Sequence, residues 1–157
     1  LELDPELAWV AAERGEALRG LGRHDEAVAA FTQAIALDPA YAWAVGHRGI
    51  ALREQGRLDE AIADFTRALE LRPDTAWALA ERGECHRQLS QLEAALADFS
   101  RAIELNPDDS WSLSRRGAAY QALAIFEEAY IDLTRAVEID PDNAWAWAQR
   151  GSLFREM

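Results

Sequence analysis

Two residue types suited to molecular recognition recur at fixed places in this chain. Tryptophan occurs at five evenly spaced sites, which we call the Trp column: Trp9, Trp43, Trp77, Trp111 and Trp145. An arginine-glycine pair follows each of them at a constant distance: Arg14-Gly15, Arg48-Gly49, Arg82-Gly83, Arg116-Gly117 and Arg150-Gly151. Trp and Arg dominate the binding energy of many protein interfaces. The column therefore either contacts a partner or packs between helices, and the pattern alone leaves both roles open.

Catalytic and metal chemistry has little support in the sequence. There is no glycine-rich phosphate loop, no nucleophile motif and no cluster of residues at metal-ligand spacing. His24, His47 and His86 fall at unrelated places, and Cys85 next to His86 would point to a different side of a helix. The many acidic residues fall on helix surfaces, where runs of charge are usually solvated. We expect a protein that is not an enzyme and that needs no metal or cofactor.

Composition narrows the classes of partner. The chain has 157 residues, 50% of them hydrophobic, and a formal net charge of −12, which disfavours nucleic acid and anionic membranes as partners. No apolar run is long enough to span a bilayer, and no secretory signal opens the chain. The single cysteine cannot form an internal disulfide, so we expect a reducing compartment and a cytoplasmic location.

The spacing of the Trp column extends to many other positions. Proline, alanine and large apolar residues repeat at the same step, and they form these columns: Pro5, Pro39, Pro73, Pro107 and Pro141; Ala27, Ala61, Ala95 and Ala129; Ala34, Ala68, Ala102 and Ala136; and Phe31, Phe65, Phe99 and Leu133. A period of this length, about 34 residues, is typical of stacked supersecondary units.

Each period predicts two helices. In the second copy the first helix is expected over 42–55 and the second over 59–71, with a break at Gly56-Arg57. The residue before Pro73 is disfavoured in helical geometry, so the second helix ends there. Polar residues that could cap the following helices precede them at Asp74-Thr75, Asp108-Asp109 and Asp142-Asn143. One such pair cannot bury both of its faces, so the pairs must stack into an all-α solenoid.

These columns resemble the tetratricopeptide repeat family. The second copy carries the family's characteristic residues at Val45, Gly49, Leu52, Ala61, Phe65, Ala68 and Pro73. The resemblance covers four full copies at about 8–41, 42–75, 76–109 and 110–143, and a partial copy at 144–157. It implies an all-α superhelical solenoid of antiparallel helix pairs, which we expect to form one domain over 1–157. We number repeat positions from Ala8, Ala42, Ala76, Ser110 and Ala144.

Charged residues depart from the family's pattern at two positions. Position 7, often leucine in the family, is arginine in all five copies, and position 23 is an acid in three of them: Asp64, Asp98 and Asp132. We predict ion pairs between the first and second helix of a pair. The alternative is that each acid pairs with the arginine three residues on in its own helix, which would contribute only ~0.2–0.5 kcal/mol, and the two pairings are compatible with each other. The fourth copy also lacks the glycine between its helices.

The resemblance implies a concave groove lined by the first helices. Carried over by position, the candidate binding residues are Trp43, Trp77 and Trp111; His47, Glu81 and Arg115; Glu16, Ile50 and Glu84; and Arg19, Arg53, Arg87 and Gln121. Small residues at position 5, such as Gly46, would leave room for a ligand backbone. Such a groove suits a protein or peptide segment with acidic and apolar side chains. Trp147, at position 4, is expected in the core.

Family members that clamp the free carboxylate of chaperone tails carry basic residues at position 5 and asparagine at position 9. This chain has neither, so that subclass is not expected. The leading hypothesis is a non-catalytic protein-interaction module or scaffold. Two alternatives remain: a spacer or oligomerising arm that acts through its ends, and a sensor arm of a larger regulatory protein.

The two ends look incomplete. Residues 1–4 resemble the tail of a second helix, and the final SLFREM ends a first helix that has no partner after it. Repeat arrays need polar surfaces at their ends. We therefore expect a piece of a longer protein, and we predict self-association through the C-terminal end.

Overall fold

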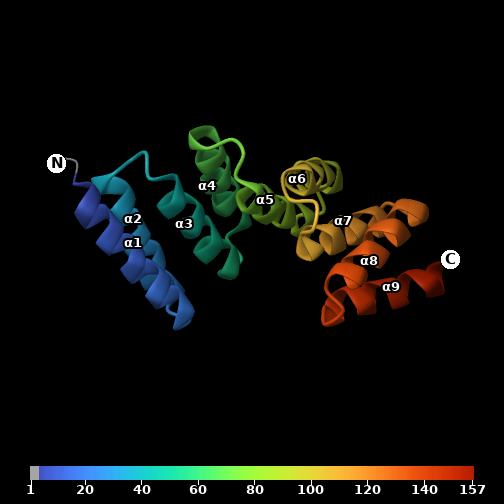
Figure 1. The fold of residues 1–157 in the computed structure, drawn as a ribbon. Coiled ribbons are helices and arrows are strands. Elements are labelled where there is room, and N and C mark those ends of the chain that lie inside the picture. The colour runs from blue at the N-terminus through green and yellow to red at the C-terminus, as the bar shows by residue number, and fades with distance from the viewer. Residues whose placement is uncertain (1–3) are drawn as a thin grey trace. The chain divides into compact units, whose positions relative to one another are not determined.

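The protein is an all-α helical repeat solenoid. The computed structural model describes residues 4–157, and over these residues the chain forms nine helices and no strand (Figure 1). The helices are α1 (Pro5–Gly20), α2 (His24–Leu37), α3 (Ala42–Glu54), α4 (Leu58–Leu71), α5 (Ala76–Gln88), α6 (Leu92–Leu105), α7 (Ser110–Ala122), α8 (Phe126–Ile139) and α9 (Ala144–Glu156). Odd-numbered helices are the predicted first helices and even-numbered ones the second. The interpretation of residues 1–4 as the tail of a second helix lies outside the described residues for 1–3, and it is wrong for Asp4, which caps the start of α1.

Side-chain caps define several helix starts. The carboxylate of Asp109 accepts a hydrogen bond from the backbone N–H of Trp111, and the Asn143 side chain accepts one from Ala146. Both caps were predicted from the sequence. Asp4 caps α1 in the same way by accepting from Leu7. These bonds satisfy N–H groups that have no partner inside the helix.

The turn within each pair uses a residue with positive φ. In the first two pairs this residue is glycine, Gly22 at φ 72° and Gly56 at φ 75°. The next two pairs place Ser90 at φ 59° and Ala124 at φ 57° at the equivalent point. The turn therefore keeps the same geometry where glycine is absent. Ser90 and Ala124 adopt the left-handed conformation with a Cβ, which is sterically unfavourable.

Replacing Ala124 by glycine is expected to raise the free energy of unfolding by about 0.5–1 kcal/mol, because glycine adopts this conformation without steric cost. Urea unfolding measures the change. The control is Ala97→Gly on the exposed side of α6, which should lower stability by up to about 1 kcal/mol because glycine is unfavourable within a helix. A loss of stability in Ala124→Gly would contradict the claim that Ala124 is strained at this turn.

By contacts between Cα atoms the chain divides into two compact units, one ending at Cys85 and the other from His86 to Met157. In the first unit α1 packs on α2, α2 on α3 and α3 on α4. In the second unit α6 packs on α7, α7 on α8 and α8 on α9, and α7 also touches α9. Each unit is described by itself below.

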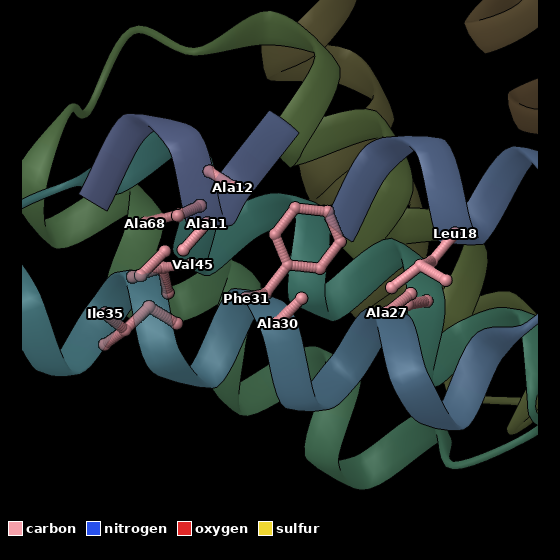
Figure 2. Packing of buried hydrophobic residues seen from close by; sticks show 12 residues of the cluster. Ala11, Ala12, Leu18, Ala27, Ala30, Phe31, Ile35, Val45 and Ala68 are labelled. Atoms are coloured by element: carbon pink, nitrogen blue, oxygen red, sulfur yellow. The ribbon is translucent and has the colours of Figure 1, made fainter. Parts of the chain in front are cut away.

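The core of the first unit is built from the predicted columns. Figure 2 shows Phe31 between α1 and α2, surrounded by alanines and by Val45 from α3. Phe31, Phe65, Phe99 and Leu133 are all fully buried, and so are the alanines of the Ala27 column. Small residues let the helix backbones approach closely, and one large side chain per pair fills the remaining space.

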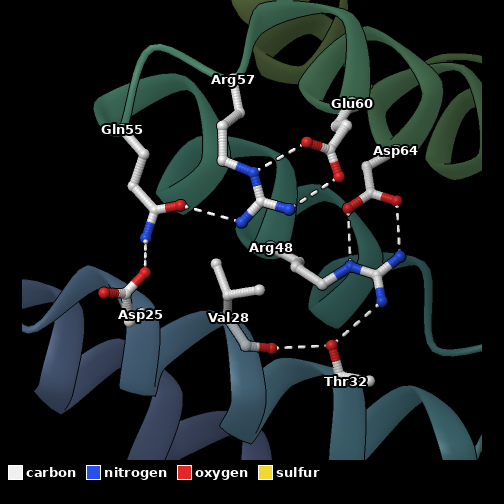
Figure 3. Close-up of polar contacts among 8 residues, drawn as sticks. All are labelled: Asp25, Val28, Thr32, Arg48, Gln55, Arg57, Glu60 and Asp64. Carbon is white, nitrogen blue, oxygen red and sulfur yellow. Dashed lines mark hydrogen bonds and ion pairs between the residues drawn. The ribbon is translucent and has the colours of Figure 1, made fainter.

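The predicted ion pairs between helices form in the second and fourth copies. The Arg48 guanidinium donates from Nε and Nη2 to both carboxylate oxygens of Asp64, each at 2.7 Å (Figure 3). Arg116 donates to Asp132 in the same way, at 2.7 and 2.9 Å. Arg67 and Arg135, three residues after these acids in the same helices, donate to the carbonyls of Pro39 and Pro107.

The prediction that Trp147 belongs to the core is wrong. Its side chain is 45% exposed, and its indole N–H donates to the Pro141 carbonyl at 3.0 Å. The equivalent Val45 and Leu113 are fully buried. A second helix covers this side of α3 and of α7, whereas no described helix follows α9 to cover Trp147.

Candidate functional site on the first-helix face

The candidate binding residues lie on the first helices, and we call the surface that they share the first-helix face. In the first unit it is formed by α1, α3 and α5 up to Cys85, and α1 touches α3. In the second unit it is formed by α7, α9 and the last residues of α5. The two parts of this face differ in how completely the chain's own side chains fill them.

In the first unit Trp77 packs on the preceding first helix, α3. A Cβ placed on Gly46 would collide with Cη2 of the Trp77 ring, so position 46 must be glycine for the indole to lie there. Trp77 keeps 37% of its surface exposed, as an indole with one face covered does. The small residue at this point accommodates a tryptophan of the same chain. The prediction that it leaves room for a ligand backbone fails at Gly46.

His47 completes an aromatic stack on this part of the face. Its ring lies nearly parallel to that of Trp43, with centroids 3.7 Å apart and an angle of 22°, and it meets Trp77 edge-on at 5.0 Å. Tyr41 stacks on Trp43 at 5.9 Å. His47 Nδ1 lies 3.0 Å from the Trp43 carbonyl, which can only accept, so Nδ1 carries the proton. His47 therefore contacts two other candidate residues, Trp43 and Trp77.

Burial lowers the pKa of His47 below its ordinary 6.5, and Arg19 acts in the same direction. The hydrogen bond to the Trp43 carbonyl and the carboxylates Glu16 and Glu13 oppose the shift. Because the folded pKa is the lower one, the unfolded chain binds more protons at acidic pH. His47 therefore destabilises the fold progressively as the pH falls below about 6.5 towards its folded pKa.

We expect the free energy of unfolding to fall between pH 7.5 and 5.5 by more in the wild type than in His47→Gln. The difference between the two proteins isolates His47 from Glu81, whose raised pKa makes the opposite contribution. Urea unfolding at several pH values measures both curves. Parallel curves would mean that His47 titrates equally in the folded and unfolded states.

Arginines at position 12 of the first unit already have acidic partners. Arg19 lies 2.5 Å from Glu16 and 2.8 Å from Glu54, and its hydrogen bond lowers the pKa of Glu16. Arg53 Nε lies 2.8 Å from Glu81. Burial nevertheless raises the pKa of Glu81, and Arg53 offsets that rise in part. Arg19 and Arg53 were predicted as binding residues, but carboxylates of this chain neutralise them.

Two further candidates of the first unit differ in exposure. Glu84 is only 3% exposed, which leaves almost no surface for a ligand, whereas Ile50 is half-buried. Cys85 is fully buried, and burial raises the pKa of its thiol to about 12. A thiol of this kind stays protonated and unreactive at neutral pH. Among the described residues no three His, Cys, Asp or Glu side chains form a group that could hold a metal ion.

In the second unit the first-helix face contains an open hollow of ≈ 330 Å³, which we call the α7–α9 hollow. It is lined by groove positions of three copies: Arg87, Ala118, Gln121, Ala122, Trp145, Gln149, Ser152 and Glu156. Gln121 Nε2 donates to Glu156 at 2.7 Å, while the Gln121 Oε1 has no hydrogen-bond partner among the described residues. Small residues, amides and one indole edge thus surround space that no described side chain fills.

Arg115 holds the indole beside this hollow. Its guanidinium lies 3.8 Å above the Trp145 ring and 5.3 Å from the Trp111 ring, both within the range of cation–π attraction. The structure thus places the candidates Arg87, Arg115, Gln121 and Trp111 at or beside one site. Trp145, Gln149, Ser152 and Glu156 were not among the candidates, although their repeat positions are those of the groove residues in the other copies.

The first unit has hollows that are less suited to binding a ligand. One of ≈ 60 Å³ lies beside Trp43 and Trp77 and is too small for more than a water or two. Another of ≈ 330 Å³ lies on the side of α2 and α4, where Arg48 and Arg57 already hold Asp64 and Glu60 (Figure 3). Within residues 4–157 no helix combines the length and the apolar character that a membrane span requires.

Comparison with known proteins identifies the class. The family model described as Tetratricopeptide repeat matches residues 12–74 and 48–110, and the chain belongs to this family. The model described as Protein prenyltransferase alpha subunit repeat matches residues 126–157. No curated protein matches the chain significantly.

Solved structures agree with this class. The first tetratricopeptide repeat domain of Spaghetti (RPAP3), solved with the HSP90 peptide SRMEEVD, is 30% identical with a TM-score of 0.71, over 73% of this chain and 91% of that one. MamA 41-end from Desulfovibrio magneticus RS-1 is 21% identical with a TM-score of 0.87, over 95% and 84%. YrrB, described as having an unusual peptide-binding site, is 23% identical with a TM-score of 0.78, over 93% and 75%.

Proposed function

We propose that this chain is a non-catalytic protein-interaction module that binds a peptide or protein segment in the α7–α9 hollow. The observation that carries the proposal is the contrast between the two parts of the first-helix face. In the first unit stacked rings and internal ion pairs fill it, whereas in the second unit ≈ 330 Å³ remains open between the same repeat positions. Concave sites with a few convergent polar groups are the usual places for ligands.

The lining favours an extended segment with apolar and acidic side chains. Gln149 and Gln121 can each donate and accept, which suits the alternating N–H and C=O groups of a peptide backbone. Trp145 supplies apolar surface, and Arg87 is a cation of the lining. Glu156 disfavours an acidic group at its own end of the hollow.

A chaperone tail is not the ligand that we propose. The relative at 30% identity was solved with an HSP90 peptide, which supports peptide binding in general. In this chain the position-5 residues Ala80, Ser114 and Ala148 carry no charge to hold a terminal carboxylate. We therefore expect an internal segment of a partner, and a cytoplasmic partner is the simplest assumption.

Filling the hollow tests the proposal. Ala118→Trp adds an indole to the floor, and the matched control Ala63→Trp adds one to the hollow of equal volume beside Arg48 and Asp64, away from the first-helix face. Peptides selected by display on the wild-type protein should lose at least tenfold in affinity for Ala118→Trp and none for Ala63→Trp. Circular dichroism confirms that both variants fold. Equal binding to all three proteins would place the ligand elsewhere.

A second candidate function is an arm that associates through its C-terminal end. The observation in its favour is the exposed apolar surface of α9 and the residue after it, where Trp147 is 45%, Phe154 58% and Met157 69% exposed. Self-association through this end would appear as a mass that rises with concentration in light scattering. A monomeric mass over a wide concentration range would count against self-association.

A further inference from the structure

The start of α8 carries an exposed surface that differs from its equivalents in the other pairs. We call it the α8 surface and define it by Ile125, Glu128 and Ile131. Ile125, the N-cap residue of α8, is 36% exposed, and Ile131 is 57% exposed. Glu128 lies three residues from each of them, so its side chain is a neighbour of both. Residues of α5, α7 and α9 line the α7–α9 hollow, so the two sites are separate.

The repeat positions of this surface are exposed even where further helices follow. In the first unit α3 packs on α2. Arg23, at the position of Ile125, nevertheless has a side chain that is 53% exposed, and Ala29, at the position of Ile131, is also exposed. The two equivalents in α4 are exposed as well. The exposure of the α8 surface therefore belongs to its repeat positions.

Glutamate at the position of Glu128 has an arginine partner in two other copies. Arg23 donates two hydrogen bonds of 2.6 Å to Glu26, and Arg57 donates two of 2.7 Å to Glu60 (Figure 3). Before α8 an isoleucine replaces that arginine, and Glu128 has no hydrogen bond or ion pair among the described residues. This carboxylate position thus suits a guanidinium that the fourth copy does not supply.

The turn before this surface is strained. Ala124 has a φ of 57°, where the first two pairs place glycine. Strain of this kind is often retained at sites that serve something other than folding. Isoleucine in place of the arginine, and in place of the alanine at the position of Ile131, likewise adds apolar area that the fold leaves in water. These departures occur together in one copy.

We propose that the α8 surface binds a helical segment of another protein, with an arginine on Glu128 and an apolar side chain on each isoleucine. Residues three apart are separated by about 4.5 Å along a helix axis, so a segment with the spacing apolar-x-x-Arg-x-x-apolar matches the surface. The formal net charge of −12 favours the approach of a basic segment. This inference is independent of the α7–α9 hollow.

The probe is a display library of helical peptides, randomised on one side, selected on the full chain and counter-selected on Ile125→Arg. That variant restores beside Glu128 the arginine that precedes α2 and α4, so it should remove the site. Selected peptides should share an arginine with an apolar residue three positions away on either side. Titration calorimetry should show one peptide per chain, with affinity for Ile125→Arg weaker on the order of tenfold or more.

Charge reversals make the test specific. Glu128→Arg should weaken binding on the order of tenfold or more, because like charges then oppose at the contact. A peptide with its arginine changed to glutamate should bind Glu128→Arg better than the wild type. The matched control Glu138→Arg reverses a charge at another exposed site of α8 and should bind the selected peptides normally. Circular dichroism checks that each variant folds.

Three outcomes would overturn the proposal. The first is a selection that yields no peptide able to distinguish the wild type from Ile125→Arg, and the second is equal affinity of the wild type and Glu128→Arg. The third is self-association in light scattering that Ile125→Arg abolishes, since the occupant would then be a second copy. Ala118→Trp should bind the selected peptides normally. Peptides that Ala118→Trp excludes and Ile125→Arg retains would support the hollow and count against the α8 surface.

Discussion

Replacing Asp64 by asparagine is expected to lower the free energy of unfolding by about 3 kcal/mol, as measured by urea unfolding. The change keeps the shape of the side chain and removes its charge. Arg48 would then keep its guanidinium between α3 and α4, where the side chain is 21% exposed, without a carboxylate to balance it. Breaking a buried pair by removing one partner typically costs ~3–5 kcal/mol, and the partial exposure of Arg48 places this case at the lower end.

The neighbouring pair in the same helix is the control. Glu60 and Arg57 are joined by two hydrogen bonds of 2.7 Å, with the same geometry as Asp64 and Arg48 (Figure 3). Their side chains are 59% and 43% exposed, so water screens the attraction and replaces it when the pair is broken. Glu60→Gln should leave stability unchanged within error. If both variants lose the same stability, burial does not set the strength of these pairs.

Truncating Trp77 to alanine is expected to lower the free energy of unfolding by about 2 kcal/mol, because a partly buried aromatic side chain is lost. The indole covers Gly46 and meets the edge of His47, so its removal opens a gap over the α3 backbone. Full burial of such a side chain would make the loss ~3–5 kcal/mol, and its 37% exposure reduces that figure. Urea unfolding measures the loss, and far-UV circular dichroism checks that the helices remain.

Trp9 is the matched control because it occupies the same repeat position on α1. It is 56% exposed, and no described helix precedes α1 to receive its ring. Trp9→Ala should cost less than about 1 kcal/mol. An equal loss in the two variants would mean that packing on the preceding first helix contributes nothing. A negligible loss of stability in Trp77→Ala would indicate that the Trp column serves binding and not packing.

The sequence alone determined the architecture. Its constant period sets where Phe65, Ala61 and Ala68 recur, and the helical spacing of these residues places them on one buried side. The breaks at Gly56 and Pro73 set the helix ends nearly to the residue. The pairing of Arg48 with Asp64 was also predictable, because two departures from the pattern occurred in adjacent helices of the same copies. These features depend on contacts that recur from copy to copy.

Only the tertiary structure decided which of the candidate residues face open space. The repeat positions of His47 and Gln149 are equivalent, yet one lies within an aromatic stack and the other lines open space. The difference depends on what neighbouring helices place opposite each residue, and a period cannot encode such contacts. Trp147 shows the same limit, because its position predicts burial and only a covering helix could provide it. The environment of a residue that packs within its own helix pair can be predicted from the sequence. The environment of a residue that faces the next helix pair can be known only from the structure.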